Sequence, residues 1–199
     1  MTIHQLSTHG LYILSGLPGS GKSTWAANVS HITPSAIIST DAIREQLFGK
    51  QFEFNAADPL VQKHSLYEGG NSAVFEIAET LLTQRMKEKL VTFIDATNIT
   101  DGDRNNWAKI AQHYGVPSTV LIFDVHGDEL VARDAARSRT IGAGIVLKNA
   151  SKFQKTSSLN HIIIKDGDTA TLSVPSLPHS QIDVIGDIHG LYDDLLAIT

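Results

Sequence analysis

The sequence predicts an α/β fold with a mostly parallel sheet and helices on both faces. Short apolar segments of strand length, such as residues 11–15 and 90–95, alternate along the chain with longer segments of helical character. Parallel strands are joined by crossover helices, and such sheets bind ligands at the carboxyl ends of their strands. Gly16, Asp41 and Asp95 lie at the ends of predicted strands, so we expect a site to form around them.

The predicted elements follow one another from residue 11 to residue 165. Strands are expected at residues 11–15, 35–40, 90–95, 118–125 and 161–165. Helices are expected at residues 22–29, around 43–48 after a cap at Asp41, at about 60–89, at 101–114 and from 128 onward. Residues 49–59 show no periodicity and are expected to form a loop. Gly69 and Gly70 weaken the long helix in its middle, because glycine lowers helix stability.

Length and charge limit the class of protein. The 199 residues are enough for one α/β domain with an appendage. We expect a domain at residues 1–170, a linker at 171–181 around Pro175 and Pro178, and a separate segment at 182–199. The formal net charge of −5 argues against broad, non-specific binding of duplexes, so any contact with nucleic acid should be local.

The sequence also bears on the compartment. It has no apolar run long enough to cross a bilayer, and residues 1–5 lack the basic and apolar regions of a secretory signal. It contains no cysteine, which excludes disulfides and thiolate metal sites and agrees with a reducing compartment. We therefore expect a cytoplasmic protein without a membrane partner. Composition does not fix the oligomeric state, and an oligomer stays open.

Residues 16–23, Gly-Leu-Pro-Gly-Ser-Gly-Lys-Ser, form a complete G-x-x-x-x-G-K-S phosphate-binding loop between a predicted strand and a predicted helix. Its glycines allow a turn that points backbone N–H groups at a polyphosphate. Lys22 is expected to reach the β- and γ-phosphates and Ser23 to bind Mg²⁺. The motif thus predicts ATP or another NTP, with Mg²⁺, as cofactors. The expected nucleotide-binding residues are Gly16, Pro18, Gly19, Ser20, Gly21, Lys22, Ser23 and Thr24.

Asp41 and Arg44 form a second group, three residues apart at the start of a predicted helix. That spacing puts the carboxylate and the guanidinium on neighbouring surface positions, so both can face one ligand. A kinase that acts on a hydroxyl needs a carboxylate within reach of that hydroxyl, and Asp41 is the candidate for this base. Arg44 would bind a phosphate of the acceptor. The alternative is a helix cap at Asp41 and a solvated Arg44.

Asp95 ends an apolar strand and is followed by Ala-Thr-Asn98. An acid in this position often steadies Mg²⁺ and its waters in phosphate-loop enzymes. The competing interpretation is structural, because Asp95 and Asn98 can also hold the neighbouring loop by hydrogen bonds to the backbone.

Arginines in a late helix predict a lid over the nucleotide. Arg133 and Arg137 are one helical turn apart, and Arg139 lies just beyond them. Such side chains can neutralise charge that develops during phosphoryl transfer, although ordinary solvation is the alternative. Residues 140–158 bring glycines and then lysines, which we interpret as a mobile basic part of the lid.

Near the end of the sequence, an apolar strand leads into Gly186-Asp-Ile-His-Gly190. Asp187 and His189 can bind one metal ion together. No further cluster of metal-ligating residues follows, so a two-metal site cannot be assembled from this sequence alone.

Taken together, these motifs resemble the bacterial polynucleotide kinase-phosphatases of RNA end repair. The kinase modules of that family carry a similar phosphate loop, an acid and arginine arranged like Asp41 and Arg44, a strand that ends like residues 95–98, and an arginine-rich lid. Residues 186–190 look like the opening metal motif of the calcineurin-like metallophosphoesterase that follows the kinase in those proteins. The resemblance implies a P-loop NTPase fold at residues 1–170 and the truncated start of a phosphatase at 182–199.

By position, the resemblance implies that Asp41 is the general base on a 5′-hydroxyl, that Arg44 binds the phosphate on the 3′ side, and that Arg133 and Arg137 contact the donor. Lys22 and Arg137 would act on the transferred phosphate. Residues 140–144 depart from the arginine-rich and proline-containing lid of the family.

The sequence therefore predicts a polynucleotide 5′-hydroxyl kinase that uses ATP or another NTP on an RNA or DNA end. Two alternatives stay open. Related phosphate-loop folds phosphorylate small molecules such as sugars, nucleosides and antibiotics. A nucleotide-binding switch or docking module, in which ATP orders the lid, is the other.

Overall fold

The computed structural model describes residues 1–29, 36–48, 66–125, 127–136 and 143–173. The strands are β1 (Ile3–Ser7), β2 (Leu11–Ser15), β3 (Ile37–Ser39), β4 (Thr92–Asp95), β5 (Ser118–Phe123), β6 (His161–Ile164) and β7 (Thr169–Ser173). The helices are α1 (Lys22–Ala27), α2 (Thr40–Phe48), α4 (Leu66–Lys87), α5 (Asp101–His113), α6 (Gly127–Ala135) and α7 (Ala143–Ala150).

The main sheet has five strands in the order β3-β4-β2-β5-β6, and every neighbouring pair is parallel. This confirms the predicted α/β fold with a parallel sheet. In the register of the sheet, Ser39 pairs with Asp95 and Leu14 pairs with Asp95 on the other side. The carboxyl ends of β3, β4 and β2 therefore meet at one edge of the sheet, which is the geometry that a ligand site needs.

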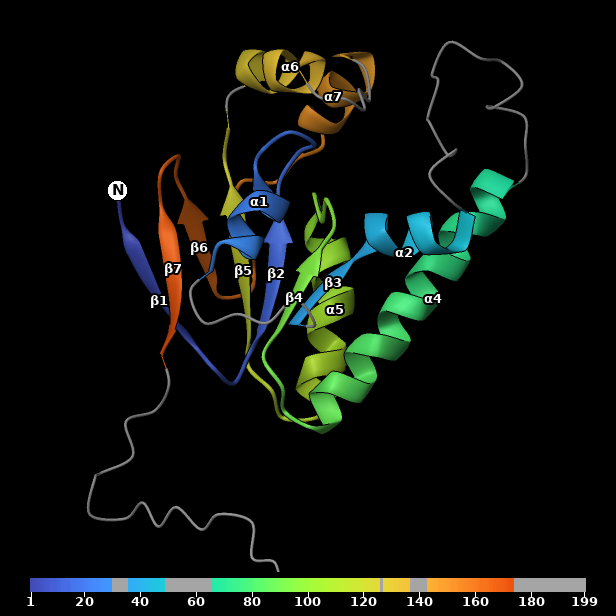
Figure 1. Cartoon of the computed structure of the whole chain (residues 1–199), viewed down its shortest axis with the longest axis vertical. Helices are drawn as coiled ribbons and strands as arrows, with labels where there is room; N and C mark the ends of the chain where they lie inside the picture. Colours follow the sequence, from blue (N-terminus) through green and yellow to red (C-terminus); the bar gives the residue numbers. More distant parts are fainter. Residues whose placement is uncertain (30–35, 49–65, 126, 137–142, 174–199) are drawn as a thin grey trace, which may run out of the picture.

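Both faces of the sheet are covered, because the strands are apolar on both sides. On one face, Ile13, Ile94 and Ile122 pack against α2, α4 and α5. On the other face, Leu14 and Phe93 pack against α1 and against β1 and β7. Figure 1 shows this layering, with the long α4 and α5 on one side of the sheet and α1 on the other.

β1 and β7 form a two-stranded parallel ribbon that the sequence analysis did not predict. Ile3 pairs with Thr169 and Ser7 with Ser173, so the first and last described elements of the chain run side by side. Only the inward positions, such as Leu6 and Leu172, are buried, and they join the core on the α1 face. Such short strands give a weak pattern, and their partners lie far apart in sequence.

Several predicted boundaries needed correction. α2 begins at Thr40, so Asp41 lies in the first helical turn and is not the cap; the Ser39 hydroxyl instead accepts a hydrogen bond from the Ala42 N–H (3.4 Å). α4 continues through Gly69 and Gly70, because its inner face packs on the core. The predicted loop at 49–59 and the start of the long helix at 60–65 lie outside the described residues.

α6 and α7 lie over the carboxyl ends of the strands, above the phosphate loop (Figure 1). They are held there by a small apolar cluster in which Leu130 and Val146 pack against Leu17 of the loop. The segment predicted to be a mobile basic lid thus contains a packed helix, α7. Within the described part of the chain, no helix combines the length and apolar character needed to cross a membrane.

Candidate active site

The phosphate loop connects β2 to α1 and is shaped by its glycines. Gly19 and Gly21 have φ angles of 83° and 87°, a region that side chains with a Cβ rarely adopt. Gly16 has a different role, because a Cβ there would lie 2.7 Å from the Ser20 hydroxyl oxygen and 3.1 Å from the Phe123 carbonyl oxygen. The glycines of the motif are therefore required by the fold of the loop, and the loop has the form that receives a polyphosphate.

The side chain of Lys22 is folded into this loop. Its Nζ donates hydrogen bonds to the carbonyl oxygens of Gly16 (2.8 Å) and Leu17 (3.0 Å) and to the Ser20 hydroxyl (3.3 Å). Lys22 is buried, yet it lines the cavity above the loop. An ammonium held at this position neutralises negative charge placed in the cradle, which fits a nucleotide phosphate.

A cavity of about 420 Å³ opens next to the loop, within the size range of small-molecule sites. Its wall brings together residues from the loop, α1, α2, α4, β4 and α6. They are Pro18, Gly19, Gly21, Lys22, Ser23, Thr24, Thr40, Asp41, Arg44, Phe75, Asp95, Ala96, Thr97 and Arg133. The juxtaposition of loop, acid, arginine and lid that the sequence predicted is thus present. Gly16 and Ser20 are not among the lining residues of this cavity.

Asp41 and Arg44 form an ion pair across one turn of α2. The Asp41 side chain is 69% exposed and projects into the cavity region, whereas the Arg44 side chain is only 19% exposed. The ion pair thereby positions the carboxylate on the first turn of α2, where it lines the cavity next to the phosphate loop. A carboxylate so held can accept a hydrogen bond from an acceptor hydroxyl.

Asp95 lies at the end of β4, between the phosphate loop and α2, and is buried. Burial raises the pKa of its carboxyl above the ordinary value, although hydrogen bonding with Ser23 and the charge of Lys22 act in the opposite direction. Asp95 and Ser23 therefore place two oxygen donors next to each other at the cavity wall, the ligand type that Mg²⁺ prefers.

Asn98 has a structural role. Its Nδ2 donates to the carbonyl oxygen of Leu14 (2.7 Å), and its Oδ1 accepts a hydrogen bond from Trp107 Nε1 (2.9 Å). Its φ of 44° lies in the left-handed region, which asparagine tolerates better than most residues. Of the two alternatives for Asn98, the contacts support the one in which it holds the loop after β4.

Arg133 comes from α6 and lines the cavity from above. Its guanidinium forms ion pairs with Glu129 on the same helix and with Asp166 at 3.4 Å in the turn after β6. The Glu129 hydrogen bond is the main reason that the pKa of Arg133 is raised. These carboxylates keep the arginine at the boundary between the cavity and its neighbour.

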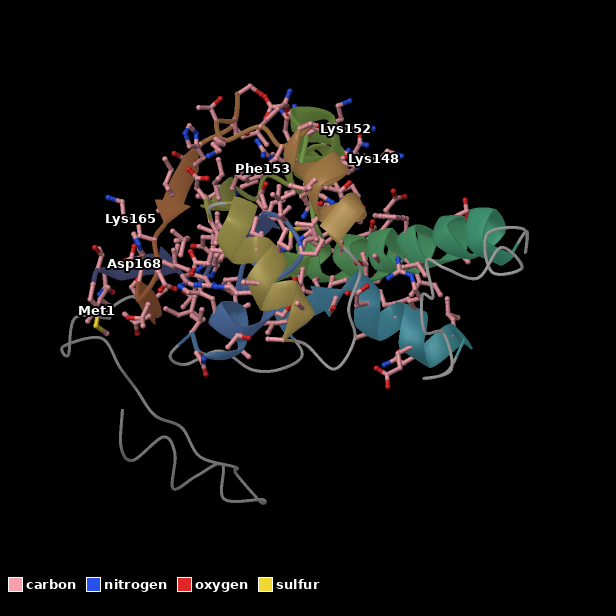
Figure 2. All side chains as sticks on the ribbon, turned by 90° about the horizontal axis from the view of Figure 1, so that it is seen from above. Met1, Lys148, Lys152, Phe153, Lys165 and Asp168 are labelled. Carbon is pink, nitrogen blue, oxygen red and sulfur yellow. The ribbon has the colours of Figure 1, made fainter. Side chains whose placement is uncertain are left out.

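A second cavity of about 370 Å³ adjoins the first and shares Gly21, Thr24 and Arg133 with it. Its walls are Trp25 of α1 and the turn at residues 165–168, which the sequence analysis did not single out. Figure 2 shows Lys165 and Asp168 of this turn near Met1. A ligand bound at the phosphate loop can therefore extend to either side of α1.

Arg104 of α5 is a buried arginine that holds several segments around the site together. The sequence analysis did not identify it. Arg104 donates to the Ser15 hydroxyl at the end of β2 (2.9 Å) and to the Asn98 carbonyl (3.0 Å). It also donates to the carbonyl oxygens of Gln154 and Thr156, just after α7. One guanidinium thus joins the strand before the phosphate loop, the loop after Asp95 and the segment leaving the lid.

Three predicted site residues, Arg137, Asp187 and His189, lie outside the described residues. Within the part that is described, no three acidic or histidine side chains gather into a possible metal-binding group. The predicted roles of these three residues stay predictions.

Comparison with known proteins agrees with this geometry. Among solved structures, an unliganded sugar kinase from Janibacter sp. HTCC2649 is similar in fold, with a TM-score of 0.57 and 14% identity over 80% of this chain and 85% of that one. A chain of the Pnkp1/Rnl/Hen1 RNA repair complex matches with a TM-score of 0.52 and 21% identity, over 76% of this chain and 48% of that one. The model of the AAA domain family matches residues 11–155, which contain the phosphate loop, Asp41, Asp95 and α6. Because this match covers well over half of the sequence, the chain belongs to the AAA domain family, and its fold is that of a P-loop kinase.

Proposed function

We propose that this protein transfers the γ-phosphate of ATP or another NTP to the 5′-hydroxyl of an RNA or DNA end. The observation that carries the proposal is the Asp41–Arg44 pair, which lines the same cavity as Lys22 and Asp95. A phosphoryl acceptor needs a hydrogen-bond acceptor for its hydroxyl, and a polynucleotide end also brings a phosphate of its own. Asp41 and Arg44 match these two requirements in one turn of helix.

The donor would bind at the phosphate loop. Lys22 leaves its loop carbonyls for the β- and γ-phosphates, and backbone N–H groups of residues 19–23 surround the polyphosphate. Ser23 and Asp95 would hold Mg²⁺, which would neutralise negative charge on the donor's phosphates. Arg133, together with Arg137, would contact the donor from the lid. The second cavity, which continues from the loop past Trp25, is suited to the rest of the nucleotide.

On the acceptor side, the exposed Asp41 carboxylate orients the 5′-hydroxyl and accepts its proton. Arg44 binds the phosphate on the 3′ side of the same nucleoside. Its planar guanidinium favours a phosphate partner, because it offers paired donors to two oxygens. A free sugar carries no phosphate for Arg44 to bind. The fold similarity to a sugar kinase does not decide between the two acceptors, because folds host many substrates.

The residues at 182–199 would then begin a metallophosphoesterase, with Asp187 and His189 as its first metal ligands. This part of the proposal depends on the motif, and a two-metal site needs more ligands than Asp187 and His189 supply.

The test uses γ-labelled ATP, Mg²⁺ and matched oligonucleotides that carry either a 5′-hydroxyl or a 5′-phosphate. We expect label only on the 5′-hydroxyl strand, and none with Lys22→Ala. Asp41→Asn should abolish transfer while ATP binding, measured by calorimetry, persists. Glu45→Gln is the matched control, since Glu45 is an exposed acid on the same helix that does not line the cavity.

Two results would contradict the proposal. Labelling of a small molecule but of no oligonucleotide would select the metabolite kinase. ATP binding without transfer to any acceptor would instead favour a nucleotide-dependent switch. Retained transfer by Asp41→Asn would remove Asp41 as the base even if the activity itself were found.

A further inference from the structure

Phe75 is the aromatic side chain among the residues that line the first cavity. It comes from α4 and is 40% exposed. Most of the other lining groups are charged, hydroxylic or glycine, so Phe75 offers a ligand the one flat apolar surface among the described lining residues. An apolar ring left in water costs free energy in proportion to its exposed area.

The ring is held in a fixed position. α4 presents a buried stripe to the core, and Val74 and Ala78 of that stripe are fully buried. Phe75 lies next to the stripe and packs one side against Trp107 of α5, with ring centroids 6.0 Å apart and an angle of 29° between the planes. Trp107 is itself fixed by its hydrogen bond to Asn98. The Phe75 ring is therefore a supported, flat surface and not a freely turning side chain.

The supported ring lies in the cavity that also holds Asp41 and Arg44. An acceptor held by those two residues has its hydroxyl and its phosphate already assigned. What is left of a nucleoside is its base, which is flat, largely apolar on its faces and matched to an aromatic ring. Stacking of a base on an aromatic side chain is a common source of affinity for single strands, and it tolerates any base because every base has a π face.

We infer that Phe75 is the stacking platform for the 5′-terminal base of the acceptor strand, which makes it a specificity-determining residue for nucleosides against simple sugars. The inference rests on the proposed function. It assigns the kinase a three-point acceptor site, with the hydroxyl at Asp41, the 3′-side phosphate at Arg44 and the base at Phe75. The site accepts all four bases to a similar degree, because stacking reads no base edge.

The experiment compares two acceptors, a 5′-hydroxyl oligonucleotide and the same strand with an abasic first residue. We expect the wild type to phosphorylate the base-bearing strand with a kcat/KM about 5- to 150-fold higher than the abasic strand, the range for one stacked base. Phe75→Leu, which keeps apolar bulk and loses the flat face, should remove most of this preference by raising KM for the base-bearing strand only. Phe75→Trp should restore it.

Leu81→Ala is the matched control, because Leu81 lies on the same helix, is 45% exposed and does not line the cavity. It should leave the preference unchanged. Thermal unfolding of each variant separates a folding defect from a binding defect, and a folding defect would lower kcat/KM on both acceptors alike.

The possible results distinguish a failure of the stacking inference from a failure of the proposed kinase function. If the wild type labels both strands equally well, or if Phe75→Leu keeps the full preference, the proposed function stands and the stacking platform is wrong. An equal loss on both strands by Phe75→Leu would likewise reduce Phe75 to a structural residue. If the wild type labels neither strand, the proposed function fails and the inference fails with it.

Discussion

Trp25 donates a hydrogen bond from its indole Nε1 to the backbone carbonyl oxygen of Asp168, at 2.8 Å. The contact joins α1, which directly follows the phosphate loop, to the turn between β6 and β7. It also places the Trp25 ring edge-on to Phe123, with centroids 5.5 Å apart. The second cavity is formed between these elements. The hydrogen bond therefore links the wall of that cavity to the helix that follows the phosphate loop.

Replacing Trp25 with Phe keeps an aromatic ring and removes this donor. We expect the free energy of unfolding to fall by about 1 kcal/mol, the usual net contribution of one hydrogen bond. Trp107→Phe is the informative comparison, because it leaves the buried Asn98 Oδ1 without its indole partner and should cost more, about 1–3 kcal/mol. Urea unfolding measures both values, and the opposite order would contradict the account of the two indoles.

Asp168→Asn should destabilise the protein in a pH-dependent way. The carboxylate accepts hydrogen bonds from the backbone N–H groups of Lys165 (3.1 Å) and Thr2 (2.7 Å) and contacts His4 Nε2 at 3.3 Å. These interactions, the backbone ones first, lower its pKa to about 2 from the ordinary value of 3.8. A lowered pKa stabilises the fold above the unfolded-state value, and this contribution disappears as the pH falls through the folded-state value.

The stability difference between wild type and Asp168→Asn should therefore be full at pH 7, shrink below about pH 4 and be nearly gone at pH 2. Denaturant unfolding at a series of pH values measures it. A difference that stays constant from pH 7 to pH 2 would show that the carboxylate charge does not matter.

Asp95→Asn should increase stability and reduce phosphoryl transfer. Burial raises the pKa of Asp95, so the folded state holds its proton more tightly than the unfolded chain does. For such a group, stability falls as the pH rises from the unfolded-state value of 3.8 to the raised value. The neutral amide avoids this cost. Thermal unfolding at pH 7 should give a higher midpoint for the variant than for the wild type. The variant should also need a higher Mg²⁺ concentration to reach half of its maximal transfer rate. A lower unfolding midpoint would contradict the prediction.

Arg104→Ala should be among the most damaging single changes in the domain. The guanidinium is fully buried, and its loss would remove the donor that it supplies to the carbonyl oxygens of Gln154 and Thr156 and one of the two donors to the Asn98 carbonyl. We expect a loss of about 3 kcal/mol or more in the free energy of unfolding, as for other broken buried networks. Lys109→Ala, an exposed change on the same helix, should stay within about 0.5 kcal/mol.

The strands of the main sheet, and the fact that Lys22, Asp41 and Asp95 line one cavity, could be predicted from the sequence for a physical reason. A strand buried on both faces must be apolar throughout, as residues 11–15 are, and parallel strands bring their carboxyl ends to one edge. The phosphate loop has a fixed spacing that only a few residue types satisfy. Asp41 and Asp95 could therefore be placed near Lys22 before any coordinates were known.

Other features depend on contacts that leave no local pattern. Arg104 looks like any helical arginine in the sequence, and only its burial against carbonyl oxygens far along the chain reveals its role. Asn98 was ambiguous because a side chain that holds a loop and one that holds a metal water are chemically alike. The second cavity depends on the contact between Trp25 and residue 168. These residues are far apart in the sequence, so no local sequence pattern predicts that they meet.

The ribbon of β1 and β7 sets the order in which the domain can be completed during synthesis. Residues 3–7 leave the ribosome before the other described elements, but their partners at 169–173 come last among those elements. Until then, Leu6 has no strand beside it and the turn that contains Asp168 has not formed its contacts with Thr2 and Trp25. Chains interrupted before that turn should therefore carry the phosphate loop with one wall of the adjoining cavity missing, so the second cavity is completed only after residues 165–173 have been made.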